Sequence, residues 1–393
     1  MKPQSISIDN VCFEFVLASY CPYPVVIYLC SQERAKGHEE NKQKGKSMPS
    51  VIRPNNAPEN STKIVIIGSG LAGLAAGQLL REAGHNALIL DKGRRAGGRM
   101  STRRAGGFLF NHGAQFVTAR SAAFSAVCAR AVQAGQLAKW PLAGREDAFS
   151  GTPAMRGLAE FMAEGLTIRQ QAEVKNITRV KPIPRPHNGP LKLQLADGTV
   201  ITCRHLIVTC PAPQTSQLLR EAAPGLSACA DLVVYAPCWT VMAGFPAPID
   251  LPRTLIQTPE GPISWATYEP FRPGASQTAA VTLQATADFS KTHLEAVPTD
   301  ICDQLLAAFA KQQNIPLPHP SYSAAHRWRY AKVEQACPQD ELFYIADTDS
   351  SIFVAGDWHP AQGDDGRFGK GTRAEDAFLS GVRAATQLNA QLG

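Results

Sequence analysis

The feature that most constrains the fold is the segment KIVIIGSGLAGLAAG at residues 63–77. Its apolar, β-branched start, Lys63–Ile67, is typical of a parallel strand that is buried on both faces. Leu71–Ala83 then carries leucine and alanine at helical spacing and is followed by a glycine, which is common at the end of a helix. Asn86–Leu90 is predicted as a second strand, and it ends at Asp91. The segment therefore predicts a strand–helix–strand unit in an open, mostly parallel sheet.

The turn between the first strand and the helix contains Gly68, Gly70 and Gly73 in the pattern G-x-G-x-x-G. Glycines at these positions allow a tight turn, the close approach of a pyrophosphate and the packing of the helix on the strand. The helix N-terminus also presents N–H groups and the positive end of its dipole to phosphates. Chance glycine-rich turns share the pattern, but here Asp91 ends the second strand, where a carboxylate accepts hydrogen bonds from ribose hydroxyls. We therefore predict a dinucleotide-binding site.

A second glycine turn follows in DKGRRAGGRM, residues 91–100. Gly97 and Gly98 allow the backbone to pass beside the phosphates again, and Arg99 is a candidate charge-assisted donor to them. The alternative is a basic turn on a solvated surface. Further on, NHGAQFVTAR at residues 111–120 combines a glycine with small and planar residues, which suits the close approach of backbone to a flat ring.

A late strand, SIFVAGDW at residues 351–358, ends in Gly356 and Asp357, and a helix of small residues is predicted at about 373–388. A Gly-Asp pair alone usually marks a turn. Placed after the two glycine turns, it indicates FAD, with Asp357 accepting hydrogen bonds from the ribityl hydroxyls. The N-terminus of the last helix would then face the pyrimidine edge of the flavin.

The middle of the chain predicts a mixed arrangement. We expect antiparallel strands at Leu166–Ile168, Val174–Val180, Leu191–Leu195 and Val200–Ile201, with a hairpin turn at Asp197 and Gly198. HLIVTCPAP at residues 205–213 predicts a buried strand that stops at Pro211, and a long helix is expected near 294–312. The expected domains are a cofactor-binding domain at 61–120, 151–234 and 336–393, and an interleaved substrate domain at 121–150 and 235–335.

Composition excludes several classes of protein. At 44% hydrophobic and 18% charged residues, the chain is typical of a globular protein. The net charge of +6 is small for 393 residues and the cations are dispersed, so we expect no nucleic-acid partner. The ten cysteines show neither C-x-x-C pairs nor metal-ligand spacing, which predicts free thiols, no metal site and a cytoplasmic location.

Residues 1–60 differ from the rest of the chain. Their apolar stretch is interrupted by Glu14, Pro22 and Pro24, so it matches neither a signal peptide nor a membrane span, and no membrane partner is expected. A polar, charged run follows. We expect this region to be disordered or not part of the natural protein.

Taken in order, these motifs resemble those of the amine-oxidase-like FAD superfamily. Within it, DKGRRAGGRMSTRR, HGAQFVTAR, TCPAPQ, AHRWRYA and AGDW resemble the renalase family, over about residues 63–390. The resemblance implies an α/β fold: a Rossmann-like FAD-binding domain of the p-hydroxybenzoate-hydroxylase type with an interleaved antiparallel-sheet substrate domain. It also implies non-covalent FAD and oxidation of dihydronicotinamide dinucleotides that carry hydride at the wrong ring position, with dioxygen as acceptor and peroxide as product.

The resemblance also implies roles for individual residues. Carried over by position, the residues at the FAD are Ala72, Arg99, Gln115 and Phe116, with Asp91 and Lys92 at the adenosine ribose and Val174 at the adenine. The motifs themselves add further candidate cofactor-binding residues: Gly68, Gly70, Leu71, Gly73, Gly98, Met100, Gly356 and Asp357. Two departures concern the substrate. Gln284 stands where bacterial relatives commonly have histidine, and residues 359–376 form an insertion.

The sequence contains no Ser-His-Asp order, paired carboxylates or H-E-x-x-H, which suits an enzyme whose cofactor carries the chemistry. Gln284 and Trp265 are the candidate residues at the reacting centre, although Trp265 also suits a core position. An amine oxidase or desaturase-like enzyme, which would need its ammonium deprotonated, remains an alternative. So does an FAD-binding redox sensor without turnover. A second G-x-G-x-x-G is absent, so a nicotinamide would enter as substrate.

Overall fold

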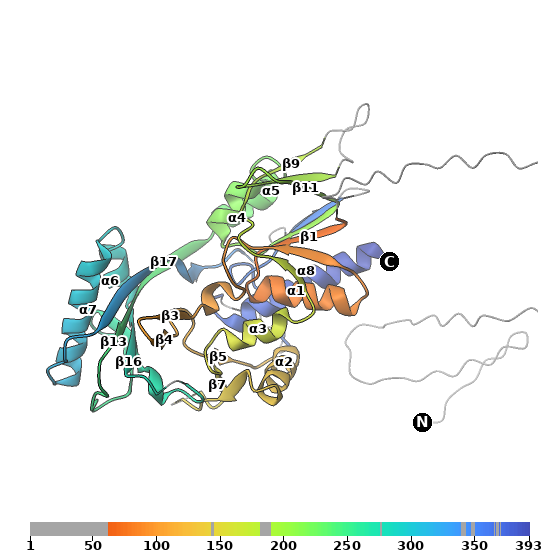
Figure 1. Ribbon diagram of the computed structural model, residues 1–393. Helices are drawn as coiled ribbons and strands as arrows, with labels where there is room; N and C mark the ends of the chain where they lie inside the picture. The colour runs from red at the N-terminus through yellow and green to blue at the C-terminus, as the bar shows by residue number, and fades with distance from the viewer. Residues whose placement is uncertain are drawn as a thin grey trace, which may run out of the picture. The chain divides into compact units, whose positions relative to one another are not determined.

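The computed structural model (Figure 1) describes residues 62–142, 145–180, 190–275, 277–338, 343–346, 350–364, 366, 369 and 371–393. These residues belong to one unit of the chain, which spans 56–393. The predictions for residues 1–60 lie outside the described residues, and the predicted insertion at 359–376 lies only partly within them.

A six-stranded sheet carries the first glycine turn. Its strand order is β18-β19-β12-β1-β2-β8, and all neighbouring pairs are parallel except the edge pair β18–β19. The strands are β1 (Ile64–Ile67), β2 (Ala87–Leu90), β8 (Thr167–Arg169), β12 (His205–Val208), β18 (Tyr344–Ala346) and β19 (Ser351–Val354). Strands β1, β12 and β19 are buried along their whole length, which confirms the interpretation of their apolar runs.

The prediction of an antiparallel strand at Leu166–Ile168 is wrong in its pairing. The strand there, β8, pairs parallel with β2, with Ile168 opposite Ile89. It has only three residues, too few to show the alternation that separates a one-sided antiparallel strand from a member of the parallel sheet.

Helices α1 (Leu71–Glu82) and α8 (Ala374–Leu392) pack together against one face of this sheet. They approach so closely that a Cβ on Gly381 would lie 2.1 Å from the carbonyl oxygen of Ala72. The small residues seen in the sequence of the last helix therefore serve the packing of the two helices.

The opposite face of the sheet is covered by a second layer with its own apolar core. The predicted antiparallel hairpins are confirmed there. This layer contains β9 (Val174–Arg179), β10 (Leu191–Leu195), β11 (Val200–Cys203), α4 (Ala212–Leu219) and α5 (Pro224–Asp231). Residues of β1 alternate between the two cores, with Ile64 and Ile66 on the α1–α8 side and Val65 and Ile67 on the other.

A five-stranded antiparallel sheet with the order β14-β15-β16-β13-β17 forms a separate layer (Figure 1). Its strands are β13 (Val234–Gly244), β14 (Leu255–Gln257), β15 (Ile263–Tyr268), β16 (Ala280–Ala285) and β17 (Tyr322–Gln335). Helices α6 (Ala287–Thr292) and α7 (Pro298–Gln313) share an apolar core with it. The predicted helix near 294–312 is thus found as α7, which starts later because Pro298 suits the first helical turn.

The remaining described elements lie between the two sheets or beside α1. They are η1 (Gly98–Met100), β3 (Arg103–Ala105), β4 (Phe108–Phe110), β5 (Val117–Thr118), α2 (Ala122–Gln133), β6 (Leu137–Lys139), β7 (Ala148–Gly151), α3 (Gly157–Ala163) and η2 (Glu269–Phe271). The α/β fold predicted from the sequence is confirmed by this arrangement. The assignment of the segments to two domains stays a prediction.

Three findings on membrane spans, metal ligands and cysteines concern the described residues only. No helix among them is both long and apolar enough to cross a membrane. No group of three or more His, Cys, Asp or Glu side chains among them could hold a metal ion. The described cysteines include free thiols at Cys128, Cys203, Cys210, Cys238 and Cys302, as expected from their spacing.

Candidate active site

Two cavities open at the carboxyl ends of the parallel strands, where open α/β sheets bind ligands. The first has a volume of about 1330 Å³ and the second about 730 Å³. Gly70, Arg99, Thr209 and Trp328 line both cavities. One elongated ligand could therefore extend from one cavity into the other past these four residues.

Glycine stands at each of the three positions of the first turn for a different structural reason. Gly68 has a φ of +104°, a conformation that favours glycine. A Cβ on Gly73 would lie 1.9 Å from the carbonyl oxygen of Gly68, so this glycine allows α1 to pack against the end of β1. A Cβ on Gly70 would meet no atom within 4 Å, because it would project into open space. The turn thus leaves a space above Gly70 that a ligand can occupy.

Asp91 already holds this turn in place. Its Oδ2 accepts hydrogen bonds from the backbone N–H of Ser69 at 2.6 Å and from the Ser69 hydroxyl at 2.7 Å, and its Oδ1 accepts one from the Gly93 N–H at 2.6 Å. The neighbouring Lys92 donates to Gln214 at 3.2 Å. Asp91 and Lys92 line the first cavity together with Val174, but their contact with an adenosine stays a prediction.

Arg99 and Asp357 form a bidentate ion pair at the junction of the cavities. The two guanidinium nitrogens donate to the two carboxylate oxygens at 2.8 and 2.7 Å, and Asp357 is only 3% exposed. Burial by itself lowers the pKa of Arg99, but Asp357 more than offsets this and raises it above its ordinary value. The sequence predicted separate roles for the two residues at the phosphates and the ribityl chain. In the structure each is the other's partner.

The two residues predicted at the reacting centre both line the second cavity. Gln284 donates from Nε2 to the carbonyl oxygen of Gly113 at 2.7 Å. Trp265 packs against Phe116 with ring centroids 5.4 Å apart, and the Arg145 guanidinium lies 4.9 Å from the centre of the Phe116 ring. Because Gln284 and Trp265 lie on paired residues of β16 and β15, the register of the sheet brings them together.

All predicted site residues except Gly73 line one of the two cavities. Those of the first are Gly68, Gly70, Asp91, Lys92, Gly98, Arg99 and Val174, and those of the second are Gly70, Leu71, Ala72, Arg99, Met100, Gln115, Phe116, Trp265, Gln284, Gly356 and Asp357. The structure thus gathers residues from six separate regions of the sequence, at 68–72, 91–100, 115–116, 174, 265–284 and 356–357. Their assigned roles stay predictions.

Beneath the floor of the second cavity lies a buried polar network that the sequence analysis missed. Glu269 and Arg272 form an ion pair at 2.9 Å with side chains 2% and 1% exposed. Glu269 also accepts hydrogen bonds from the backbone N–H and side-chain amide of Asn111, at 3.0 and 2.9 Å, and from the Thr282 hydroxyl. Arg272 donates to the backbone and side-chain carbonyls of Gln115. The network therefore fixes the loop at 111–115, which contains Gly113, to the antiparallel sheet.

The start of α8 forms another wall of the second cavity, and the sequence analysis did not identify its residues. Thr372 and Arg373 line the second cavity, and Thr372 has a φ of +78°, which a β-branched residue rarely adopts. Next to them, the Glu375 carboxylate accepts hydrogen bonds from the N–H of Arg120 at 2.9 Å and of Ser121 at 2.7 Å. The last helix is thereby tied to the start of α2.

Asp376 lies in the same first turn of α8, and burial disfavours its ionised carboxylate. Burial, with a smaller contribution from Asp357 and Glu375, raises its pKa from 3.8 to about 6. The folded protein therefore binds this proton more tightly than the unfolded chain does. Between pH 4 and 6, approximately, the stability of the folded state falls as the pH rises, and the loss is complete above pH 6.

We expect Asp376→Asn to stabilise the FAD-free protein at pH 7.5 and to have little effect at pH 4. The amide removes the charge that burial disfavours and can still accept the hydrogen bond from the Arg373 N–H. Urea unfolding at the two pH values measures the difference. Asp300→Asn, an exposed acid in the first turn of α7, controls for losing a charge at a helix N-terminus. An equal gain in the free energy of unfolding at both pH values would contradict the raised pKa of Asp376.

Comparison with known proteins adds the family context. The chain matches the family model of an NAD(P)-binding Rossmann-like domain over residues 66–131 and that of a flavin-containing amine oxidoreductase over residues 135–389. A crystal structure from Exiguobacterium sp. 255-15, named as a protoporphyrinogen oxidase, superposes with a TM-score of 0.64 at 15% identity. The match covers 84% of this chain and 99% of that one, so the two share a fold.

Two relatives are similar over short segments. An L-amino-acid oxidase from Notechis scutatus scutatus is 33% identical over 98 residues, which cover 24% of this chain and 18% of the relative. An L-glutamate oxidase precursor from Streptomyces viridosporus is 44% identical over 66 residues, covering 16% and 9%. The chain thus matches less than a fifth of the length of either relative.

Proposed function

Because this chain belongs to the flavin-containing amine oxidoreductase family and is therefore an FAD-dependent oxidoreductase, we propose that its donors are dihydronicotinamide dinucleotides that carry hydride at the wrong ring position. In this proposal dioxygen is the acceptor and hydrogen peroxide the product. The renalase-like motifs of the sequence lead to this choice within the family, and the charge of the second cavity supports it.

The residues present fit FAD. The open space above Gly70 is where a pyrophosphate would approach the N-terminus of α1. Arg99 and Asp357 lie where the two cavities join, so the dinucleotide could extend through both. When bound, FAD supplies a two-electron acceptor that dioxygen can reoxidise. The protein's part is to bind and orient the donor and to exclude water from it.

The observation that carries the proposal is the charge of the second cavity. Among the described residues that line it, the charged side chains are Arg99, Arg120, Arg145, Lys332, Arg373 and Asp357. Its single carboxylate is already paired with Arg99. A protonated amine would therefore meet an excess of like charge and no available carboxylate. A donor that carries a diphosphate would be attracted.

Two groups are placed to hold a flat donor. Phe116 and Trp265 form an aromatic wall of the cavity, which suits a dihydropyridine ring and excludes water. Gln284 is fixed by its hydrogen bond to Gly113, and its side-chain oxygen is available to accept one from the donor's carboxamide. Loss of hydride from a dihydropyridine requires no separate base, which agrees with a cavity lined by no His or unpaired acid among its described residues.

Amine or amino-acid oxidation is the second candidate, because the matched family and relatives carry those names. The aromatic pair Phe116 and Trp265 would serve an amine as well as a dihydropyridine. This candidate, however, requires a neutral amine in a basic cavity. The two functions therefore differ in the charge of the donor.

The test is to mix the FAD-loaded protein without oxygen with borohydride-treated NAD⁺, which contains the misreduced isomers. In parallel it is mixed with ordinary NADH, with L-amino acids and with simple amines. We expect rapid loss of the visible FAD absorbance with the isomers alone, and its return with formation of peroxide on admitting air. Gln284→Ala should raise the KM for the isomers without lowering FAD content. Bleaching by amines or amino acids, with none by the isomers, would overturn the proposal.

A further inference from the structure

The first cavity is lined by more positive charge than a bound FAD accounts for. The cationic side chains among its described lining residues are Lys92, Arg94, Arg95, Arg99, Arg103, Arg104, Arg156, Lys175, Arg327 and Arg329, and the acidic ones are Asp91, Glu160 and Glu173. Burying or confining like charges costs free energy unless a counter-charge is present. Such a surplus in a concave site indicates an anionic ligand.

Five of these ten cations already have a carboxylate partner. Arg99 pairs with Asp357, Lys175 with Glu173, and Arg95 with Glu160 at 3.9 Å. Arg327 and Arg329 both bind Glu295 at 2.7 Å.

Among the described lining residues, the cations without an ion pair are Lys92, Arg94, Arg103, Arg104 and Arg156. Arg103 and Arg104 belong to β3 and Arg156 directly precedes α3, whereas Lys92 already donates a hydrogen bond to Gln214.

Electrostatic coupling indicates that these three arginines lie close together around one space. Burial lowers the pKa of Arg156, Glu160 acts in the opposite direction, and Arg95 and Arg104 lower this pKa further. Arg103 and Arg156 act in the same direction on His112, whose pKa burial, with His326 and these arginines, lowers to about 3. The cluster therefore holds positive charges that repel one another, and a bound anion would relieve this repulsion.

Two buried polar atoms at this cluster lack a protein partner. The Nε of Arg156 and the Nδ1 of His112 make no hydrogen bond of normal geometry to the described residues, although the Phe110 backbone lies near the His112 ring. His112 is only 8% exposed, and it lines the first cavity. Arg156 itself is held by a hydrogen bond from Nη2 to the carbonyl oxygen of Thr102 at 2.8 Å. Unsatisfied buried polar atoms in a cavity of this kind are typical of a ligand site.

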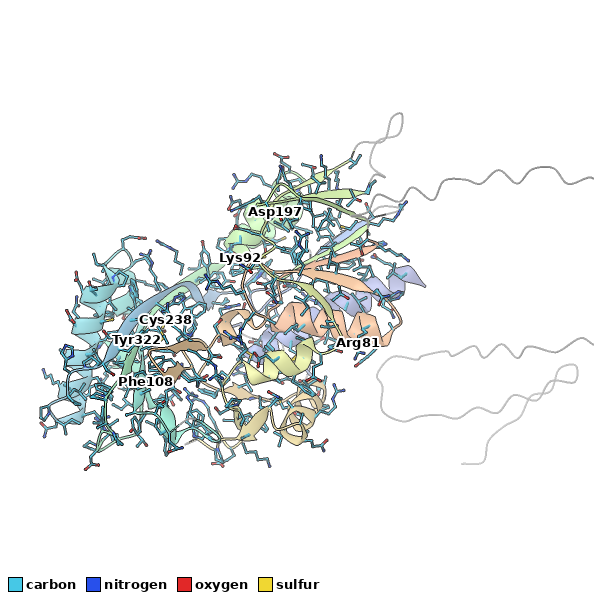
Figure 2. All side chains as sticks on the ribbon, in the orientation of Figure 1. Arg81, Lys92, Phe108, Asp197, Cys238 and Tyr322 are labelled. Carbon is cyan, nitrogen blue, oxygen red and sulfur yellow. The ribbon has the colours of Figure 1, made fainter. Side chains whose placement is uncertain are left out.

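The hairpin that carries Arg103 and Arg104 is firmly attached. Phe110 of β4 stacks on Tyr322 of β17 with ring centroids 5.6 Å apart. Phe108 packs into the same group, and Figure 2 shows Phe108 and Tyr322 beside each other at the edge of the antiparallel sheet. The backbone at Arg103 and Arg104 is thus held in place beside the cavity, while their side chains remain exposed.

We propose that Arg103, Arg104 and Arg156, together with His112, form a site in the first cavity for the phosphate or diphosphate group of a ligand other than FAD. Arginine suits this role because its planar guanidinium binds phosphate oxygens in pairs. The stacked rings of His112 and Trp328, with centroids 5.4 Å apart, form one wall of the site. The ligand's phosphate belongs either to the electron donor or to a separate effector.

The binding test uses the FAD-loaded protein and inorganic pyrophosphate, measured by titration calorimetry. We expect saturable binding that weakens with added salt. The variant with Arg103→Gln and Arg104→Gln together should bind about tenfold or more weakly, with unchanged FAD content. Arg329→Gln is the matched control, because Arg329 lines the same cavity but is paired with Glu295. No binding by the wild type, or equal binding by the double variant, would overturn the proposal.

The source of the phosphate is then decided with whichever donor reduces the enzyme. If pyrophosphate raises the KM for that donor and leaves kcat unchanged, the site holds the donor's own phosphate. If it changes kcat with the KM unchanged, the site belongs to an effector. The site does not depend on the proposed reaction, because pyrophosphate binding is measured without turnover. Failure of the dihydronicotinamide proposal would leave the calorimetric result unaffected.

Discussion

Gly70→Val is expected to give a folded protein that purifies without FAD. Gly70 has φ −74° and ψ 178°, which valine can adopt, and a Cβ there contacts no protein atom within 4 Å. The added side chain would instead fill the space in which the pyrophosphate approaches α1. The visible absorbance of the purified protein measures FAD content, and circular dichroism and thermal unfolding of the FAD-free form check the fold.

Gly73→Ala is the matched variant, and the opposite result is expected of it. Its Cβ would lie 1.9 Å from the carbonyl oxygen of Gly68, so α1 and the end of β1 must move apart. We expect a loss of about 3 kcal/mol or more in the free energy of unfolding of the FAD-free protein. Stoichiometric FAD in Gly70→Val, or a fully stable Gly73→Ala, would contradict the roles assigned to the two glycines.

Arg272→Met is expected to lower the free energy of unfolding by about 3–5 kcal/mol, because removing one partner of a buried ion pair leaves the other charge uncompensated. Arg272 is the only cation that the described contacts place on Glu269, and it also satisfies both carbonyl oxygens of Gln115. Urea unfolding of the FAD-free protein measures the change without the stabilisation that bound FAD would add.

Two further variants separate the ion pair from the rest of the network. Adding Glu269→Leu should restore only part of the stability, because the N–H groups of Asn111 and the hydroxyl of Thr282 would lose their acceptor. Glu295→Gln is the control, since its carboxylate pairs with two arginines but is exposed and remains solvated. If Arg272→Met and Glu295→Gln lower the free energy of unfolding equally, the buried ion pair has no special structural role.

Local patterns predicted the parts of the site that are close in sequence. The turn at Gly68, Gly70 and Gly73 could be predicted because its backbone requirements are met within a few residues of the strand and helix. Asp91 could be placed because the strand–helix–strand unit has a narrow range of lengths. The antiparallel hairpin that turns at Asp197 and Gly198 was equally local.

Contacts between distant segments could not be predicted in this way. Arg99 and Asp357 are 258 residues apart, and each alone fits an interaction with the cofactor. The pair of Glu269 and Arg272 in YEPFRPG reads as a solvated turn, because only the fold shows that Asn111 and Gln115 surround it. The three residues of β8 gave no periodicity from which to judge the direction of pairing.

The connectivity of the six-stranded sheet determines how late during synthesis the sheet can be completed. β1 pairs with β12, and β12 with β19, so the centre of the sheet is incomplete until β19 has left the ribosome. The helix that packs against α1, and whose Glu375 holds the start of α2, is α8, which is synthesised after all of these strands. The nucleotide turn is therefore synthesised before the strands and the helix that support it. Until α8 has been synthesised, the apolar face of α1 that it covers stays exposed in the newly made chain.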